Sequence, residues 1–175
     1  MRILCTGNPD KKTIAWAVRE KWPHAQTISL SQGYDLRMQN EQDIQKFKEK
    51  ILSCNIFINS SYINEQAQST MLDLAVKEWI AKDIKGHVFT IGTTLEWNPS
   101  NNSTYKNSKI KLRDLSLHYN NQTGLTGVKS TYIMLGGVKT AQSEDAVDPN
   151  DVTNVIEWIA SRSERIGLIQ IDCVK

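Results

Sequence analysis

Short apolar runs alternate along this chain with longer stretches in which apolar residues recur every three or four positions. Each short run is bounded by polar, Gly or Pro residues, as buried strands are, and the runs predict strands at 2–6, 26–31, 55–59, 87–91, 129–135 and 168–172. Between the first two runs, Ile14, Ala17, Val18 and Trp22 lie at i, i+3, i+4 and i+8. This spacing predicts a helix that ends at Pro23.

Similar helical spacing recurs between the later runs. It predicts helices around 44–51 and 71–79, then at 103–119 and at 151–162. The last follows Asp148-Pro149-Asn150-Asp151, whose acidic residues suit the positive end of a helix dipole. Strict alternation of strand and helix predicts a doubly wound, Rossmann-like α/β fold, with a parallel sheet covered by helices on both faces. No repeat or long linker divides residues 1–175, so we expect a single domain.

Composition narrows the function classes. With 39% hydrophobic and 23% charged residues the chain is typical of a globular protein, and no apolar run approaches the ~20 residues of a membrane span. A net charge of +2 with scattered lysines does not indicate a nucleic-acid partner. The N-terminus lacks a signal-peptide pattern, and Cys5, Cys54 and Cys173 stand in apolar surroundings without metal-ligand spacing. We therefore expect reduced thiols, no bound metal and a cytoplasmic protein.

Ligands of doubly wound folds bind at the carboxyl ends of the strands, so residues at those ends are the candidates for chemistry. The first strand ends in Thr6-Gly7, ahead of a helix that begins near Thr13. A glycine permits a tight turn there, and a helix N-terminus offers free N–H groups to a pyrophosphate. Small and hydroxylic residues follow two later strands, at 59–61 and 92–94.

Tyr105 and Lys109 are the most suggestive pair of reactive side chains. Their i, i+4 spacing puts both on one face of the predicted helix. An ammonium beside a phenol favours the phenolate, so we expect Lys109 to lower the pKa of Tyr105 from its reference near ~10. A tyrosine of that kind can act as a proton donor near neutral pH.

Taken in order, these segments resemble the short-chain dehydrogenase/reductase family. Thr6-Gly7 resembles the start of its Thr-Gly-x-x-x-Gly-x-Gly loop, and Asp35-Leu36 resembles its Asp-Val/Leu pair beside the adenine. Asn59-Ser60-Ser61 stands where Asn-Asn-Ala-Gly is usual. Thr93 lies twelve residues before Tyr105, close to the family's serine-to-tyrosine spacing. The resemblance spans nearly the whole chain.

The second half of the chain continues this resemblance. Tyr105-x-x-x-Lys109 matches the family's signature pair, and Leu135–Thr140 resembles its Pro-Gly-x-Val-x-Thr segment. The chain is nevertheless compact and divergent. It lacks two glycines of the first loop, where Ile14-Ala15 instead resembles enoyl-thioester reductases, and it carries Thr93 in place of the catalytic serine. The spacing of the Tyr–Lys pair favours carbonyl or alcohol chemistry over enoyl reduction, and Gln68 is the counterpart suggested for the family's helical asparagine.

The resemblance implies a hydride transfer between NAD(P)(H) and a small carbonyl or alcohol. In that reading Tyr105 donates the proton, Thr93 binds the reacting oxygen, and Lys109 tunes Tyr105 and holds the nicotinamide ribose. The cofactor-binding set shares positions beside the family's nucleotide-contacting segments and comprises Gly7, Lys11, Lys12, Thr13, Ile14, Ser31, Asp35, Leu36, Asn59, Ser60, Ser61, Tyr105, Lys109, Gly136, Val138 and Thr140.

The second strand bears on the choice of cofactor. If it ends in Ser31-Gln32-Gly33, it carries no carboxylate to repel a 2′-phosphate, and Lys11 and Lys12 are suitably placed to attract one. We therefore expect NADP(H) to be favoured over NAD(H).

Two other readings stay open at this level. The first is a non-catalytic dinucleotide-binding module that acts as a sensor or interaction partner, which the missing glycines and Thr93 favour. The second is an unrelated doubly wound fold such as a flavodoxin-like domain.

The resemblance also implies a homodimer that pairs through the helix bearing Tyr105.

Overall fold

A computed structural model of the chain describes residues 1–10, 12–98, 103–122, 127–138 and 146–172. Strands and helices alternate through these residues. The six strands are β1 (Ile3–Thr6), β2 (Gln26–Ile28), β3 (Ile56–Asn59), β4 (His87–Thr93), β5 (Lys129–Leu135) and β6 (Leu168–Ile171). The helices are α1 (Ile14–Lys21), α2 (Glu41–Leu52), α3 (Ala67–Ala81), α4 (Thr104–Gln122) and α5 (Pro149–Ala160), with short 3₁₀ helices η1 (Leu30–Gln32) and η2 (Thr94–Trp97).

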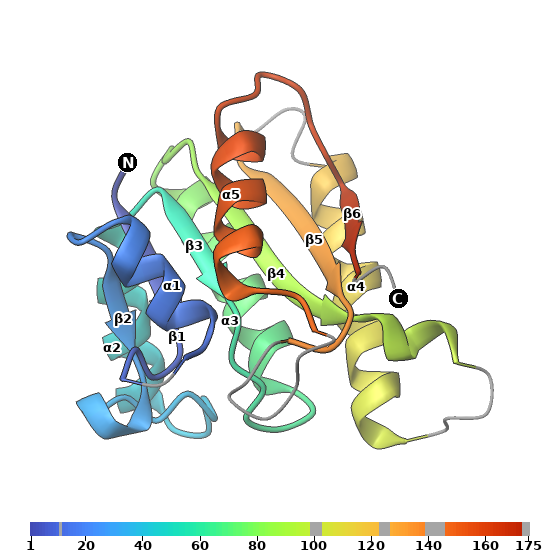
Figure 1. Ribbon diagram of the computed structural model, residues 1–175. Coiled ribbons are helices and arrows are strands. Elements are labelled where there is room, and N and C mark those ends of the chain that lie inside the picture. The colour runs from blue at the N-terminus through green and yellow to red at the C-terminus, as the bar shows by residue number, and fades with distance from the viewer. Residues whose placement is uncertain (11, 99–102, 123–126, 139–145, 173–175) are drawn as a thin grey trace.

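The strands form one sheet in the order β2-β1-β3-β4-β5-β6, and every pairing is parallel. The chain moves outward from β1 to β2 and then crosses back past β1 to β3, so the winding reverses between β1 and β3 (Figure 1). Such a switch point opens a crevice at the carboxyl ends of the strands. These ends lie toward the lower edge of the sheet in Figure 1.

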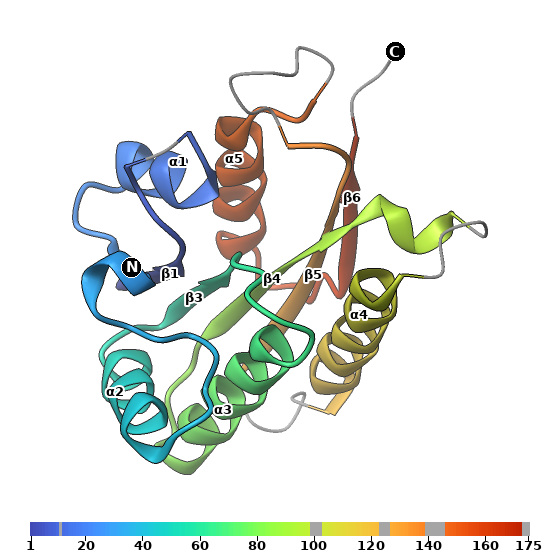
Figure 2. The same ribbon diagram turned by 90° about the horizontal axis from the view of Figure 1, so that it is seen from below.

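Helices cover both faces of the sheet, as Figure 2 shows with α1 and α5 on one side and α2, α3 and α4 on the other. Each face has its own apolar core. Phe57, Trp79 and Leu112 belong to the core beneath α2, α3 and α4, and Ile58 and Ile156 belong to the core beneath α1 and α5. The predicted doubly wound, Rossmann-like fold is confirmed.

Polar caps set where the helices begin. The hydroxyl of Thr13 accepts a hydrogen bond from Trp16 N at the start of α1, and Asn40 accepts one from Asp43 N at the start of α2. Asp148 caps α5 in the same way, with Pro149 in the first turn, where its missing N–H costs nothing. These caps satisfy amides that have no partner within the helix.

Two strand ends differ from the predicted ones, and both bear on the site. β2 stops at Ile28 because the chain turns into η1, where Gln32 N and Tyr34 N both donate to Ser29 O. The predicted strand end at Ser31 is therefore wrong. β4 runs to Thr93, beyond the predicted Ile91, because β5 pairs with it along its whole length.

Three further observations concern the cysteines, membrane spans and metal ligands. Cys5 and Cys54 are buried and free, and Cys173 lies outside the described residues. Within the described part of the chain, no helix is long and apolar enough to cross a membrane. No group of three or more His, Cys, Asp or Glu side chains in that part is placed to hold a metal ion.

Candidate active site

Hydroxyl groups shape the crevice at the switch point. The Thr6 hydroxyl at the end of β1 accepts hydrogen bonds from Ser60 N and Ser61 N at 2.9 and 3.0 Å, and the Ser60 hydroxyl donates to Thr6 O. Gly7 N donates to Ile28 O at 2.9 Å. These bonds tie the carboxyl ends of β1, β2 and β3 together and leave the outer faces of the two loops open.

A cavity of about 280 Å³ lies over these loops. Its lining combines the turn after β1, the start of α1 and the ends of β3 and β5, and consists of Gly7, Asn8, Lys12, Thr13, Ile14, Ala15, Ser60, Ser61 and Val138. Gly7 has φ +134°, and a Cβ there would lie 3.0 Å from Ala15 Cβ and 3.3 Å from Ser61 Oγ. The positive φ requires glycine, and its missing side chain leaves the helix N-terminus accessible. The cavity fits a phosphate group at the positive end of α1.

A second cavity of about 270 Å³ lies beyond β2 and is lined by Leu30, Tyr34, Asp35, Leu36, Arg37 and Ile63. Its apolar and aromatic walls suit a flat heterocycle. The Asp35 carboxylate accepts hydrogen bonds from Arg37 Nε, and this pairing lowers the pKa of Asp35 to about 2. Asp35 and Leu36, which were expected beside an adenine, both line this cavity, and the carboxylate of Asp35 is engaged by Arg37, a cation that the sequence interpretation missed.

The three predicted catalytic side chains meet at the carboxyl end of β4. Thr93 is the last residue of that strand, and its hydroxyl hydrogen-bonds to the half-buried phenol of Tyr105 on α4. The same hydroxyl accepts from Leu95 N at 3.3 Å, which fixes its orientation. Lys109 follows one helical turn after Tyr105, and its ammonium lies 5.5 Å from the centroid of the tyrosine ring.

Buried amides hold Lys109, of which only 3% is exposed. Its Nζ donates to Gln68 Oε1 at 2.6 Å and to Ile91 O at 2.9 Å. Gln68 Nε2 in turn donates to Asn59 O at 2.9 Å, and Asn59 Nδ2 donates to Gln68 O at 2.8 Å. This chain of bonds connects β3, α3, β4 and α4, and so joins the end of β3 to Lys109. Asn59 Oδ1 is buried with no hydrogen-bond partner in the structure.

The electrostatics of the pair differ from the expectation. Burial raises the pKa of Tyr105, partly offset by the hydrogen bond from Thr93, and Lys109 is not among the groups that shift it. Burial also lowers the pKa of Lys109 to about 8, against which the charge of Glu96 acts. The predicted lowering of the Tyr105 pKa by Lys109 is therefore wrong for this structure: desolvation acts on both groups, and the ammonium is directed at Gln68 and Ile91.

Tyr62, in the loop after β3, was missed by the sequence interpretation. Its ring packs edge-on against Tyr105 with 4.7 Å between centroids, and the Lys109 ammonium lies 5.7 Å from its centroid. Tyr62 is 40% exposed and forms an outer wall of the catalytic pair. No local motif marks it, because its contacts depend on how α4 lies beside the β3–α3 loop.

The remaining predicted cofactor residues lie at varying distances from these cavities. Ser31 is exposed in η1, and its hydroxyl bonds to that of Ser29 at 2.9 Å. Because β2 ends at Ile28, the residue directly after the strand is Ser29 and not Ser31. Gly136 follows β5, where a Cβ would lie 2.1 Å from Asp172 Oδ1. Lys11 and Thr140 lie outside the described residues.

Comparisons with known proteins bear on the fold. The sequence matches no protein-family profile and no curated protein. Solved structures do match, among them a short-chain dehydrogenase from Leptospira borgpetersenii with bound NAD⁺, at TM-score 0.76 and 14% identity over 97% of this chain and 90% of that one. A serine dehydrogenase complexed with NADP⁺ matches at TM-score 0.77 and 16% identity, over 98% and 94% of the two chains.

A third match is the 3-ketoacyl-(acyl-carrier-protein) reductase of Brucella melitensis complexed with NADH, at TM-score 0.75 and 10% identity over 97% of this chain and 96% of that one. At such low identity the likeness is one of fold. The predicted resemblance to short-chain dehydrogenases/reductases is confirmed at that level.

Proposed function

We propose that this chain is an oxidoreductase of the short-chain dehydrogenase/reductase type, which transfers a hydride between a nicotinamide dinucleotide and a small carbonyl or alcohol. The observation that carries the proposal is that the candidate binding cavities and the candidate catalytic residues lie at the carboxyl ends of neighbouring strands. Two cavities lie at the ends of β1, β2 and β3, and Thr93, Tyr105 and Lys109 come together at the end of β4 beside α4. The structural neighbours were solved with NAD⁺, NADP⁺ or NADH, which supports the same class of cofactor.

Each of the two cavities is assigned one part of the dinucleotide. Gly7, Thr13 and Ile14 would hold the pyrophosphate at the start of α1, because the N–H groups of a first helical turn favour an anion. Asp35 and Leu36 would lie against the adenine. Ser60, which lines the first cavity, would lie beside the adjacent ribose, whereas the side chain of Asn59 is fully buried and supports this strand end through its bond to Gln68 O. When bound, the nicotinamide supplies the hydride acceptor or donor.

The protein side of the reaction is a proton transfer at Tyr105. Its phenol stays protonated at neutral pH, since burial raises its pKa, and is therefore available to donate to a carbonyl oxygen. Thr93 would donate a second hydrogen bond to that oxygen. Lys109 lies within reach of Tyr105, and its ammonium is the positive group that can lower the cost of a phenolate as the proton leaves.

We propose that NADP(H) is preferred over NAD(H). The residue directly after β2 is Ser29, which carries no charge to repel a 2′-phosphate. Its hydroxyl bonds to Ser31 and Gln32. Lys12 is exposed on the rim of the pyrophosphate cavity and supplies a positive charge nearby.

The test is a titration of the purified protein with NADPH and NADH, followed through quenching of tryptophan fluorescence. Trp16 makes such quenching informative, because it lies in the first turn of α1, directly after Ile14 and Ala15 of the cavity lining. Consumption of the reduced nucleotide is then measured over a panel of small aldehydes and ketones. Failure to bind either nucleotide would contradict the proposal, whereas binding without turnover on any carbonyl would favour the sensor or interaction module.

A further inference from the structure

A fully buried carboxylate lies beside the catalytic cluster. Glu96 belongs to η2, three residues after Thr93, and its side chain has 0% exposed surface. Burying a carboxylate is unfavourable unless charged or hydrogen-bonding partners compensate for the lost water. A short loop after a strand has no packing need for such a group, since an apolar residue would fill the space.

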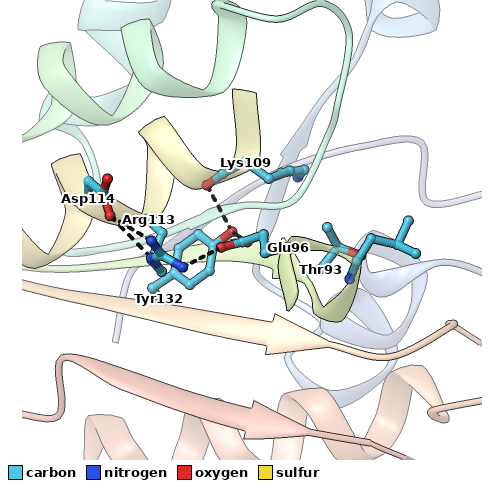
Figure 3. A network of polar contacts seen from close by, with 7 residues as sticks. Thr93, Glu96, Lys109, Arg113, Asp114 and Tyr132 are labelled. Carbon is cyan, nitrogen blue, oxygen red and sulfur yellow. Dashed lines mark hydrogen bonds and ion pairs between the residues drawn. The ribbon is translucent and has the colours of Figure 1, made fainter. Parts of the chain in front are cut away.

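Two residues from different elements bind this carboxylate, as Figure 3 shows. The phenol of Tyr132 on β5 donates to Glu96 Oε1, and Arg113 Nη1 on α4 donates to Glu96 Oε2 at 3.1 Å. The Tyr132 hydroxyl also lies 3.2 Å from Lys109 O. Glu96 is thereby connected to the backbone of the residue that carries the ammonium of the candidate site.

The backbone of β4 makes room for this arrangement. A Cβ on Gly92 would lie 1.9 Å from the hydroxyl of Tyr132, so only glycine lets the phenol cross the strand to reach Glu96. A glycine inside a strand often marks such a close approach. The network therefore spans β4, η2, α4 and β5 and fixes α4 against the strand end that bears Thr93.

The same carboxylate acts on Lys109 through its charge. Burial lowers the pKa of Lys109, and the negative charge of Glu96 acts in the opposite direction and helps to keep the ammonium protonated. The other groups that face Lys109 are the phenols of Tyr105 on its own helix and Tyr62 on the β3–α3 loop, with the neutral Gln68 on α3. Glu96 differs from these groups in that it is a carboxylate, and it forms an ion pair with Arg113 at 3.1 Å.

We infer that Glu96 is a positioning residue for the proposed reaction: with Tyr132 and Arg113 it fixes the turn of α4 that carries Tyr105 and Lys109. The inference rests on the proposed function for its meaning. Its first test, however, needs neither cofactor nor turnover.

That test is the titration of Lys109 in the free protein by NMR of ¹³Cε-labelled lysine, with the signal identified by its loss in Lys109→Met. Glu96→Gln keeps the size of the side chain and an acceptor for Tyr132 but removes the charge. We expect the pKa of Lys109 to fall from about 8 by at least about 0.5 units. An unchanged titration in a folded Glu96→Gln protein would overturn the inference.

Asp114→Asn is the matched control. Asp114 also binds Arg113, through Nη2 at 3.0 Å, but 62% of its side chain is exposed, so the solvent screens its charge. The titration of Lys109 should stay at the wild-type value in this variant. A fall as large as that in Glu96→Gln would show that any loss of charge near Arg113 has the effect, and would also overturn the inference.

Tyr132→Phe tests position without removing the charge, and it serves if Glu96→Gln does not fold. We expect kcat on a carbonyl that the wild type reduces to drop by about tenfold, with the dissociation constant of the dinucleotide unchanged, because small displacements of a catalytic group are costly. Wild-type kcat would exclude the positioning role. If the wild-type protein binds no dinucleotide, the proposed function fails, while the NMR titration still decides whether Glu96 controls Lys109.

Discussion

Two halves of the molecule meet different physical demands: the half around β1, β2 and β3, proposed to bind the nucleotide and called the nucleotide half below, and the half around β4, α4 and β5, proposed to carry the catalytic residues and called the catalytic half. The first shapes an open crevice with hydroxyls and backbone groups, such as the bonds of Thr6 to Ser60 and Ser61. The charged side chains that line its cavities, Lys12, Asp35 and Arg37, are exposed or partly exposed. The second buries ions, Lys109 and Glu96, and must supply each with several partners. The polar groups of the first half are left open to a ligand, whereas the buried ions of the second half find their partners within the protein.

This difference predicts how substitutions act. Buried ions in a region of low dielectric have large interaction energies, and removal of one partner leaves another unsatisfied. Changes in the catalytic half should therefore act on kcat and on stability, whereas changes in the nucleotide half should act on cofactor affinity.

Tyr105→Phe should have the largest effect. It deletes the proposed proton donor and little else, so turnover should fall by about 10³-fold or more, with dinucleotide affinity nearly unchanged. The measurement is steady-state kinetics with a carbonyl compound that the wild-type protein reduces, together with fluorescence titration of the cofactor. Normal activity in this variant would remove Tyr105 from the mechanism.

Lys109→Ala is the expected exception to this division. Since Lys109 is assigned both to Tyr105 and to the nicotinamide ribose, this change should reduce kcat and cofactor affinity together. It also removes the 2.6 Å bond to Gln68 Oε1 and the 2.9 Å bond to Ile91 O, so thermal unfolding should occur at a lower temperature than in Tyr105→Phe.

Substitution of Thr93 should have the next largest effect on kcat. Thr93→Val removes the hydroxyl that bonds to Tyr105 and would contact the reacting oxygen, and kcat should fall by on the order of 10²-fold. Thr93→Ser keeps the hydroxyl and should preserve or raise activity. A Val variant as active as the wild type would shift this role to Thr94 or eliminate it.

Gly7→Ala tests the nucleotide half. The residue has φ +134°, and a new Cβ would lie 3.0 Å from Ala15 Cβ, so the turn before α1 must shift. We expect dinucleotide affinity to fall by about tenfold, while the activity at saturating cofactor stays close to that of the wild type. Gly137→Ala is the control, because a Cβ there would meet nothing closer than Ala146 Cβ at 3.9 Å. A loss of kcat at unchanged affinity in Gly7→Ala would contradict the division of the molecule.

Cofactor choice should show the smallest effect. NADPH should bind several-fold more tightly than NADH at low salt, and the margin should shrink in Lys12→Ala and at higher ionic strength, since an exposed lysine is a screened point charge. Ser29→Asp should reverse the preference by placing a carboxylate directly after β2. Equal dissociation constants for the two nucleotides in the wild-type protein would defeat the assignment.

By itself the sequence determined the features that depend on local period and spacing. The alternation of strand-like and helical runs was enough for the doubly wound fold, and the i, i+4 spacing of Tyr105 and Lys109 was enough to put them on one helical face. Resemblance in motif order then placed Thr93 opposite them. These features could be predicted because each depends on neighbours within a few residues, or on a single strand and the helix after it.

The tertiary structure alone decided the rest. It ended β2 at Ile28, so that Ser29 and not Ser31 follows the strand, and it raised the pKa of Tyr105 that Lys109 was expected to lower. It also brought Glu96 to Tyr132 across Gly92. The physical reason is common to all three. Desolvation and buried hydrogen bonds depend on which segments, distant in sequence, the sheet register places together, and no local pattern carries that information.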